Sequence, residues 1–433
     1  MSNTALSSTL ASALAGDIED AADMAFTDAT SPVQANARPV PRISIQAFCE
    51  TADVAGAAQV AADDRRLAKA HVAINMGGCD AAGHHFASNP TPNLIILESL
   101  AKRAELLAEL DRLAEHCDAG TKVIIVGHLN DVTLYRDLLK RGVSEYLVAP
   151  VTAGQLMESI SNLYNNPETD PVGHVHAYIG AKGGCGSSTI CHNAAWMMSE
   201  ALKSNVVVAD MDLAFGTTGL DFNQDPMQGI GDALATPERL DEVLLDRLLT
   251  KCSEHLSIFA APVTLERSYD ITPESCESVL DVVRQNVPFV AIDLPHTWMA
   301  WTKTVLLRAD EVIITAAPDL ANLRNAKNIV DLLRQTRRND SLPHLVLNTV
   351  GMPKRPEIAV KEFEAALDLK AAAVIEFDIE TFGQAANNGQ MIVETNAKAK
   401  SVPALRQLAL ALAHREERIE KKPGLLERLK LKR

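Results

Sequence analysis

The 433-residue sequence contains no apolar run that approaches the ~20 residues needed to cross a bilayer, so no membrane-spanning helix is expected. Its seven cysteines include no Cys-x-x-Cys pair and no dense cluster, which argues against a disulfide scaffold and a zinc site. A net positive charge is also lacking, because the 56 Asp and Glu outnumber the 41 Lys and Arg and give a formal net charge of −15. Since phosphate neutralisation dominates nucleic-acid affinity, no specific nucleic-acid partner is expected.

The first 42 residues have few large apolar side chains and are rich in Ala, Ser, Thr and Asp. This composition cannot bury enough surface to offset the entropy of ordering, so residues 1–42 are predicted to form a disordered acidic arm. The arm has neither the basic start nor the continuous apolar stretch of a secretory signal. A cytoplasmic location is therefore expected.

With 47% apolar and 22% charged residues, the remainder has the composition of a globular protein, and the chain is long enough for two or three domains. From residue 43 to 164, short apolar runs alternate with segments that carry apolar residues at helical spacing. This repeated βα pattern implies a small parallel sheet. The predicted strands are Ile43–Phe48, His71–Asn75, Leu94–Leu97, Lys122–Val126 and Glu145–Val148, and the predicted helices are Glu105–His116, Val132–Lys140 and Ala153–Leu163.

A polar stretch with two prolines, residues 165–173, is predicted to be a linker. A second βα series follows over residues 174–413, and its apolar runs are as continuous as those of parallel strands buried on both faces. The fold class is therefore expected to be α/β in both domains. The predicted strands of the second series are His174–Ile179, Asn205–Ala209, Leu256–Ala260, Phe289–Ile292, Glu311–Thr315, His344–Leu347 and Ala373–Phe377.

The first strand of the second series leads into a glycine-rich loop and then a helix, which is the setting of a phosphate-binding loop. Its glycines permit positive φ angles and let backbone amides approach an anion, although a run of glycines alone could form an ordinary tight turn. Ser188 stands where a hydroxyl ligand of Mg²⁺ belongs. The residues expected to hold the nucleotide are Gly183, Gly184, Cys185, Gly186, Ser187, Ser188 and Thr189.

The segment Lys182–Thr189, KGGCGSST, resembles the KGGxGKTT deviant Walker A motif of MinD, ParA and related dimeric ATPases. The resemblance implies bound ATP and Mg²⁺ and a catalytic role for Lys182, which matches the signature lysine that reaches across a nucleotide-sandwiched dimer. Ser187 departs from the motif, because the superfamily has there the lysine that neutralises the β- and γ-phosphates. Its loss should weaken nucleotide affinity and turnover, so ATP binding is expected and hydrolysis stays open.

Later strand ends carry four further residues of the superfamily pattern. Asp210 and Asp212 resemble the DxD of the MinD switch, which implies that Asp212 orients the attacking water. Asp293 resembles the Walker B aspartate, and the resemblance makes Asp210 and Asp293 supports of the metal beside Ser188. Asn348 resembles the residue that reads the adenine edge. A helix-capping or loop acid is the alternative interpretation of Asp210 and Asp212, and an ordinary loop residue is that of Asn348.

The resemblance narrows to the CpaE/TadZ proteins of tight-adherence (Flp) pilus assembly, in which a receiver-like domain precedes a MinD-like domain and serine can replace the loop lysine. Matching stretches are Gly219–Asp241, Ile314–Leu333 and Phe382–Glu394, within a resemblance that covers nearly all of residues 43–413. It implies a receiver-like (flavodoxin-like) domain over residues 43–164 and a doubly wound MinD/ParA-like P-loop ATPase domain over residues 174–413.

The receiver-like domain lacks the residues of a working phosphoswitch. By alignment with receivers, Glu98 replaces the phosphorylated aspartate, Gly127 the switch Thr or Ser, and Ala149 the lysine before Pro150. Without this lysine an acyl phosphate would lack its cationic partner. We interpret the domain as a pseudo-receiver used for docking or dimerisation, with a working phosphoswitch as the alternative.

The tail, residues 414–433, contains eight Lys or Arg against four Glu, and three of its leucines share one helical face. A basic amphipathic helix of this kind could lie on anionic lipid, as the C-terminal anchors of MinD relatives do. A solvated charged end or a partner-binding helix is the alternative interpretation.

The resemblance implies a localisation and assembly factor for a Flp-type pilus, acting as a homodimer whose nucleotide state changes its contacts. Its expected partners are the pilus secretion ATPase and the inner-membrane pilus platform or a polar landmark, so a place at the inner membrane or cell pole is expected. Two alternatives remain: an active MinD- or ParA-type ATPase that positions division sites, flagella or DNA, and a scaffold that has lost nucleotide binding.

Overall fold

The computed structural model describes Val40, residues 43–164 apart from Ala119, and residues 173–414 apart from Ser268 and Arg338. Almost all of the predicted disordered arm, nearly all of the predicted linker, and the predicted basic tail after His414 lie outside the described residues. The chain divides into two compact units, of which the first contains residues 43–164, with Asn339–Ser341, and the second contains residues 173–337 and 342–414.

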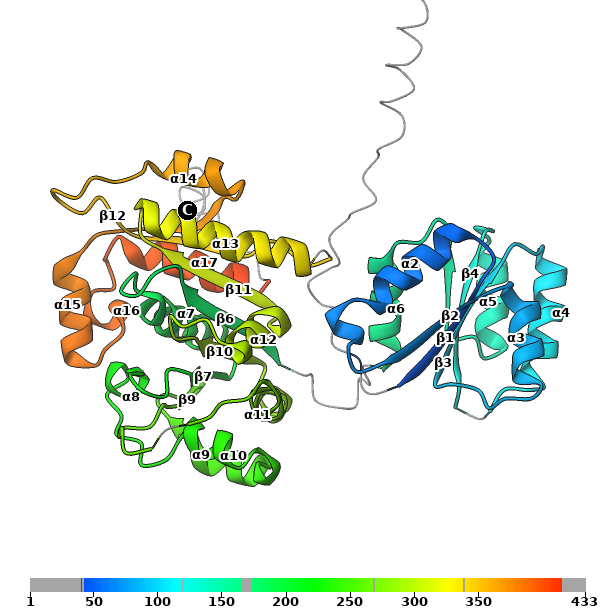
Figure 1. Ribbon diagram of the computed structural model, residues 1–433, viewed down its shortest axis with the longest axis horizontal. Coiled ribbons are helices and arrows are strands. Elements are labelled where there is room, and N and C mark those ends of the chain that lie inside the picture. Colours follow the sequence, from blue (N-terminus) through cyan, green and yellow to red (C-terminus); the bar gives the residue numbers. More distant parts are fainter. Residues whose placement is uncertain are drawn as a thin grey trace, which may run out of the picture. The chain divides into compact units, whose positions relative to one another are not determined.

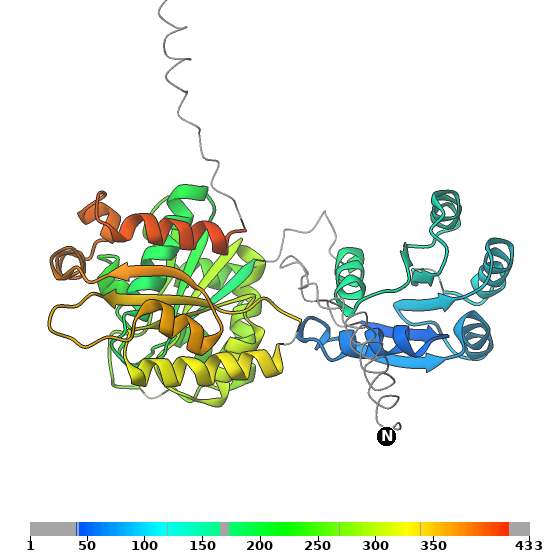
Figure 2. The same ribbon diagram turned by 90° about the horizontal axis from the view of Figure 1, so that it is seen from above.

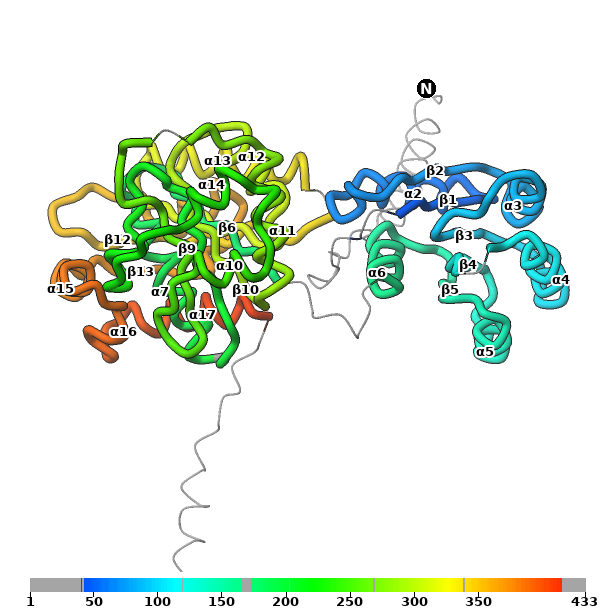
Figure 3. Tube along the Cα trace, turned by 90° about the horizontal axis from the view of Figure 1, so that it is seen from below, coloured from blue at the N-terminus to red at the C-terminus, as the bar shows by residue number. Residues whose placement is uncertain are grey.

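The first unit is built on a five-stranded parallel sheet in the order β2-β1-β3-β4-β5 (Figure 1). Helices α2 and α6 pack on one face, while α3, α4 and α5 cover the other (Figure 3). The strands are β1 (Ser44–Cys49), β2 (His71–Met76), β3 (Leu94–Ser99), β4 (Lys122–Gly127) and β5 (Glu145–Val148), and the helices are α2 (Ala52–Ala62), α3 (Gly78–Phe86), α4 (Arg103–Ala114), α5 (Val132–Lys140) and α6 (Ala153–Tyr164), with a 3-10 turn at Arg65–Leu67.

The second unit is built on an eight-stranded sheet in the order β13-β12-β11-β6-β10-β7-β9-β8, in which the pairing of β8 with β9 is antiparallel and the other pairings are parallel. The strands are β6 (His174–Gly180), β7 (Val206–Asp210), β8 (Thr250–Lys251), β9 (Leu256–Phe259), β10 (Phe289–Asp293), β11 (Glu311–Ala316), β12 (His344–Val350) and β13 (Ala371–Glu376).

Helices cover both faces of this sheet. The side chains of α9 to α14 form one core with it, and those of α7, α15, α16 and α17 form the other, so the sheet lies between α13 and α17 (Figure 2). The helices are α7 (Ser187–Leu202), α8 (Thr218–Asp221), α9 (Ile230–Ala235), α10 (Glu242–Leu248), α11 (Pro273–Asn286), α12 (Ala300–Arg308), α13 (Leu320–Thr336), α14 (Val360–Leu367), α15 (Ile379–Asn388), α16 (Ile392–Thr395) and α17 (Ser401–Leu412), with a 3-10 turn at Pro237–Arg239.

The α/β fold class predicted from the sequence is confirmed: a receiver-like parallel sheet is followed by a doubly wound sheet. Each apolar run predicted as a strand is one, because parallel strands covered on both faces bury consecutive side chains. The pattern missed α2 and α3, in which small alanines and glycines blur the helical spacing, and the two-residue strand β8. No helix among the described residues is long and apolar enough to cross a membrane.

The order of the second sheet brings three strand ends together. Strand β10 lies between β6 and β7, and Asp293 is in register with Tyr178 on one side and with Asp210 on the other. Since the carboxyl ends of parallel strands meet at one edge, the glycine loop after β6 and both acids lie at the same edge of the sheet.

Candidate functional site

The glycine loop joins the last residue of β6 to the first turn of α7. Gly184 and Gly186 have φ angles of +80° and +89°, in the left-handed region that L side chains rarely adopt. A Cβ on Gly186 would lie 2.4 Å from the amide nitrogen of Asn348, so a side chain has no room there. These two glycines are therefore required by the shape of the loop.

Side chains from neighbouring strands and helices hold the loop through its carbonyl oxygens. Asn325 of α13 donates to Ala181 O at 2.8 Å, and Nδ1 of His296 lies 2.9 Å from Gly180 O. Asn348 donates to Cys185 O at 2.9 Å. The amide of Asn348 thus fixes the loop in this structure, and its reading of adenine stays a prediction.

Three side chains of the loop, those of Lys182, Cys185 and Ser187, differ in exposure and in their contacts. Lys182 is exposed. Burial would raise the pKa of Asp319, but hydrogen bonds from Asn322 and, after them, the charge of Lys182 hold that pKa below its usual value. The Cys185 thiol is buried and donates to Thr315 O at 3.2 Å, and burial raises its pKa, so it packs as a thiol. The Ser187 hydroxyl is buried without a hydrogen-bond partner among the described residues.

Two buried carboxylates face this loop. Asp210 and Asp293 are 0% and 3% exposed, and burial raises the pKa of both, that of Asp293 to about 7. The charge of His192 and the hydroxyl of Ser188 act in the opposite direction on Asp293. Oδ1 of Asp293 is buried with no hydrogen-bond partner in the described part of the chain. The Asp293 carboxyl group as a whole is close enough to Ser188, at the start of α7, for the Ser188 hydroxyl to act on its pKa.

Asp212 sits at the rim of the site. Its own backbone amide donates to Asp210 Oδ1 at 3.1 Å, and its Oδ1 accepts from the amide of Phe215 at 3.1 Å. This pair of turns carries the chain from the end of β7 to α8 and leaves Asp212 half-buried. The structure thus brings Asp212 to the same edge as Asp210 and Asp293.

Sequence reasoning missed His192, in the second turn of α7. Its ring is 1% exposed and lies 2.8 Å from Asp221 Oδ2 through Nδ1, and 3.6 Å from Asp293 Oδ2 through Nε2. Burial would lower the pKa of His192, but the hydrogen bond to Asp221 and the charge of Asp293 raise it above its ordinary value. A lone histidine within a helix carries no sequence signal; only the order of the strands reveals that acids surround it.

Comparison with known proteins follows the division into two units. Over 157 residues the chain is 29% identical to the septum site-determining protein MinD of Synechocystis, a match that covers 35% of this chain and 56% of that protein. The crystal structure of a ParA family ATPase from Chlorobium tepidum matches with a TM-score of 0.51 and 24% identity, covering 55% of this chain and 98% of that one. The chain belongs to the MinD/ParA superfamily.

The N-terminal region of this MinD/ParA-superfamily protein has a different relative. It is 43% identical to the pilus assembly protein CpaE of Caulobacter crescentus, over 30% of this chain and 98% of that solved chain, with a TM-score of 0.29. No protein-family model matches the chain.

The site's residues fit the Mg²⁺-nucleotide that the superfamily implies. Mg²⁺ is commonly held by one or two carboxylates together with substrate phosphates and water, and the Asp293 carboxylate, with one buried oxygen that has no partner among the described residues, fits such a role. Among the described residues, no group of three or more His, Cys, Asp and Glu side chains could hold a metal ion.

In the receiver-like unit, residues of the protein itself bind the carboxylate at the position of the phosphorylated aspartate of receivers, Glu98. The Glu98 carboxylate is fully buried and accepts hydrogen bonds from the amides of Glu50 and Thr51, both at 2.8 Å, and from the Thr51 hydroxyl at 2.7 Å. Nε2 of His128 lies 3.1 Å from Glu98 Oε1, the oxygen that also accepts from the Thr51 hydroxyl, whereas both amides donate to Oε2. Although burial opposes them, these contacts lower the pKa of Glu98. Both carboxylate oxygens thus have protein partners already.

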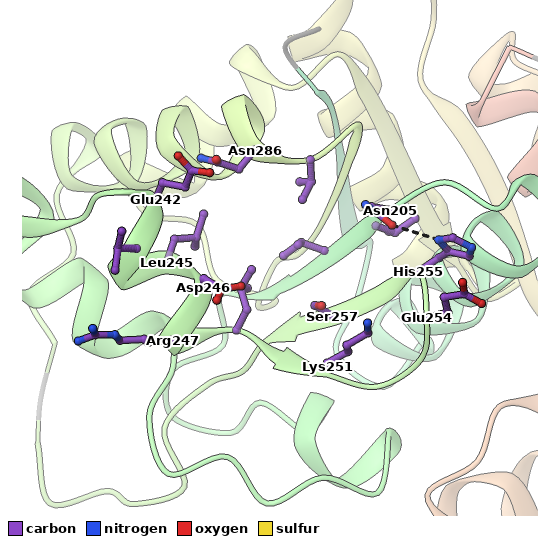
Figure 4. A pocket seen from close by; sticks show the side chains of 15 residues that line it. Asn205, Glu242, Leu245, Asp246, Arg247, Lys251, Glu254, His255, Ser257 and Asn286 are labelled. Atoms are coloured by element: carbon purple, nitrogen blue, oxygen red, sulfur yellow. Dashed lines mark hydrogen bonds between the residues drawn. The ribbon is translucent and has the colours of Figure 1, made fainter. Parts of the chain in front are cut away.

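Two hollows lie on the second unit. One, of about 610 Å³, adjoins the start of the loop and is lined by Gly180, Ala181, His296 and Trp298, among others. The other, of about 660 Å³, lies where β7 and β9 begin, at the opposite end of the sheet, and contains the contact between His255 and Asn205 (Figure 4). None of the predicted site residues lines the second hollow.

Proposed function

We propose that this protein is a nucleotide-dependent localisation and assembly factor for a Flp-type (tight-adherence) pilus, which binds Mg-ATP as a homodimer and hydrolyses it weakly or not at all. The observation that carries the nucleotide claim is the pair of unpartnered buried oxygens, Ser187 Oγ and Asp293 Oδ1, at an edge that also holds a left-handed glycine loop. The 43% identity to a CpaE pilus assembly protein supports the pilus role.

In this proposal each residue has a physical task. Backbone amides of Gly183 to Thr189 bind the phosphates, and Lys182 is exposed for contact with the nucleotide of a partner subunit. Ser188, Asp210 and Asp293 hold Mg²⁺, which neutralises phosphate charge, and Asp212 orients water. Asn348 contributes to the adenine side. Because Ser187 supplies no cation, transition-state charge is stabilised less than in relatives with a loop lysine.

The proposed partners are the pilus secretion ATPase and an inner-membrane pilus platform or polar landmark, with peripheral membrane contact through the basic tail. Deletion of the gene should abolish surface pili, and the full chain should restore them. The Gly186→Arg variant should fail, because a side chain at this position collides with Asn348 and closes the loop. Normal piliation in the deletion strain would rule out the pilus role.

The second candidate is an active ATPase of the MinD or ParA type, which the 29% identity to MinD favours. Turnover separates the two. Steady-state hydrolysis by purified full-length protein, stimulated by DNA or by a cell-division partner, would establish the second candidate. Hydrolysis at the background rate under the same conditions is the result that the first predicts.

A further inference from the structure

The side chain of His192 connects the nucleotide edge to helix α8. Its Nδ1 lies 2.8 Å from Asp221 Oδ2, and its Nε2 lies 3.0 Å from Thr218 Oγ1. Thr218 and Asp221 are the first and last residues of α8 and share one face of it. The ring also packs against Phe222, with centroids 5.5 Å apart. One buried ring therefore holds both ends of α8.

The same ring faces the acids of the sheet. Nε2 lies 3.6 Å from Asp293 Oδ2, while Thr218 donates to Asp210 Oδ2 through its hydroxyl at 2.7 Å and its amide at 3.2 Å. Since the Thr218 hydroxyl gives its only proton to Asp210, the contact with His192 Nε2 uses Thr218 as acceptor. The contacts thus form one chain from Asp293 and Asp210 through His192 and Thr218 to Asp221.

Helix α8 is short. It is four residues long, too short to be stable without packing, and it lies beside α7 and α15 (Figure 1). Leu220 of α8 is 73% exposed, and Phe215 and Met227 on the flanking segments are 74% and 90% exposed. A change in the position of α8 would therefore change the apolar surface that this end of the unit presents.

We propose that His192 is a positioning residue that couples occupation of the nucleotide site to the position of α8. The coupling rests on the proposed function, since it needs a ligand at Asp293 and Asp210. A ligand that binds the Asp293 carboxylate would alter the contact between Asp293 and Nε2 of His192. A shift of the His192 ring would then move Thr218 and Asp221, which contact the same ring. Neither of these residues needs to touch the nucleotide.

Hydrogen exchange of the full chain, read by mass spectrometry with and without saturating Mg-ATP, tests the coupling. In the natural protein Mg-ATP should slow exchange both in the loop, residues 180–189, and in the α8 segment, residues 218–222. In His192→Ala the loop should still respond while the α8 segment does not. His192→Gln, whose amide can still donate to Asp221, should restore part of the α8 response.

Two further variants make the result decisive. Asp221→Ala removes the α8 end of the contact at a side chain that is 25% exposed, so the fold should survive and the α8 response should again be lost. His255→Ala, at the far end of the sheet, should respond like the natural protein. An α8 response that persists in His192→Ala and Asp221→Ala overturns the coupling. Absence of any Mg-ATP response in the natural protein instead overturns the proposed function.

Discussion

Ser187 occupies a position where the superfamily pattern has a lysine, and its buried hydroxyl has no hydrogen-bond partner among the described residues. The Ser187→Lys variant should therefore bind Mg-ATP at least about tenfold more tightly, because a charge-assisted hydrogen bond contributes ~1.5–3 kcal/mol. Isothermal titration of the full chain measures this gain. Ser187→Ala is the matched control and should stay near the natural affinity; equal affinities in all three proteins would contradict the assigned place of Ser187.

The hydrogen bonds of Glu98 decide whether the first unit can accept a phosphoryl group. With both oxygens bound by Glu50, Thr51 and His128, the carboxylate is a poor nucleophile, and no lysine stands at Ala149. Incubation with Mg²⁺ and acetyl phosphate should leave the intact mass unchanged. A gain of one phosphoryl mass that disappears in Glu98→Gln would restore the phosphoswitch interpretation.

The C-terminal end of α15 lies in Phe382–Glu394, a stretch that resembles the CpaE/TadZ proteins, and its packing can be tested. Gly389 ends α15 with φ +62°, and a Cβ there would lie 2.6 Å from Leu220 O. Gly389→Ala should therefore destabilise the protein by about 1–3 kcal/mol. Gly383→Ala, in the same helix and with open space around its Cβ, should instead stabilise by up to ~1 kcal/mol. Chemical denaturation compares them; equal effects would contradict the assigned contact with Leu220.

Just after α17, His414 makes a pH-dependent contact with Glu311. His414 Nε2 lies 3.3 Å from the buried Glu311 carboxylate, which also faces His344 and His176. The hydrogen bond to Glu311 raises the pKa of His414. Because the pKa of His414 is raised in the folded protein, its contact with Glu311 stabilises the folded state fully at pH values below the ordinary histidine pKa. This stabilisation is lost as the pH rises through the pKa of His414 in the folded protein.

His414→Asn tests this contact, since asparagine tolerates the φ of +50° at this position. With 35% of the His414 side chain exposed, solvent screening limits the effect to about 0.5–1 kcal/mol. The variant should therefore melt below the natural protein near pH 6, and the difference should shrink by about pH 8. A difference in melting temperature that is constant across this range would contradict the assignment.

The elements were more predictable than their contacts. The strands could be predicted because both faces of each sheet are covered, so that the strands read as continuous apolar runs. The glycine loop could be predicted because its backbone is left-handed at Gly184 and Gly186, which requires glycine. Helix α2 escaped detection because it is largely alanine. His192 and the holding role of Asn348 escaped because both depend on strand order, which brings β10 and β12 near a loop over a hundred residues earlier in the chain. Local pattern carries no such information.

Considered as a whole, the chain combines a receiver-like first unit with a second unit of the MinD/ParA fold. The first unit lacks the phosphoswitch residues, so in this proposal the second unit alone senses a small molecule, and the first provides contacts. Control of the whole protein would then depend on whether the loop at residues 180–189 binds a triphosphate.

Calorimetric titration of the full chain with Mg-ATP, with mass measured by light scattering at the end point, tests this dependence most directly. We predict saturable binding heat and a shift to dimer mass, both absent in Gly186→Arg. The variant must retain the natural far-ultraviolet circular dichroism, so that only the loop differs. If the natural protein gives neither heat nor a change in mass at millimolar Mg-ATP, the loop is a structural turn and the nucleotide assignment is wrong.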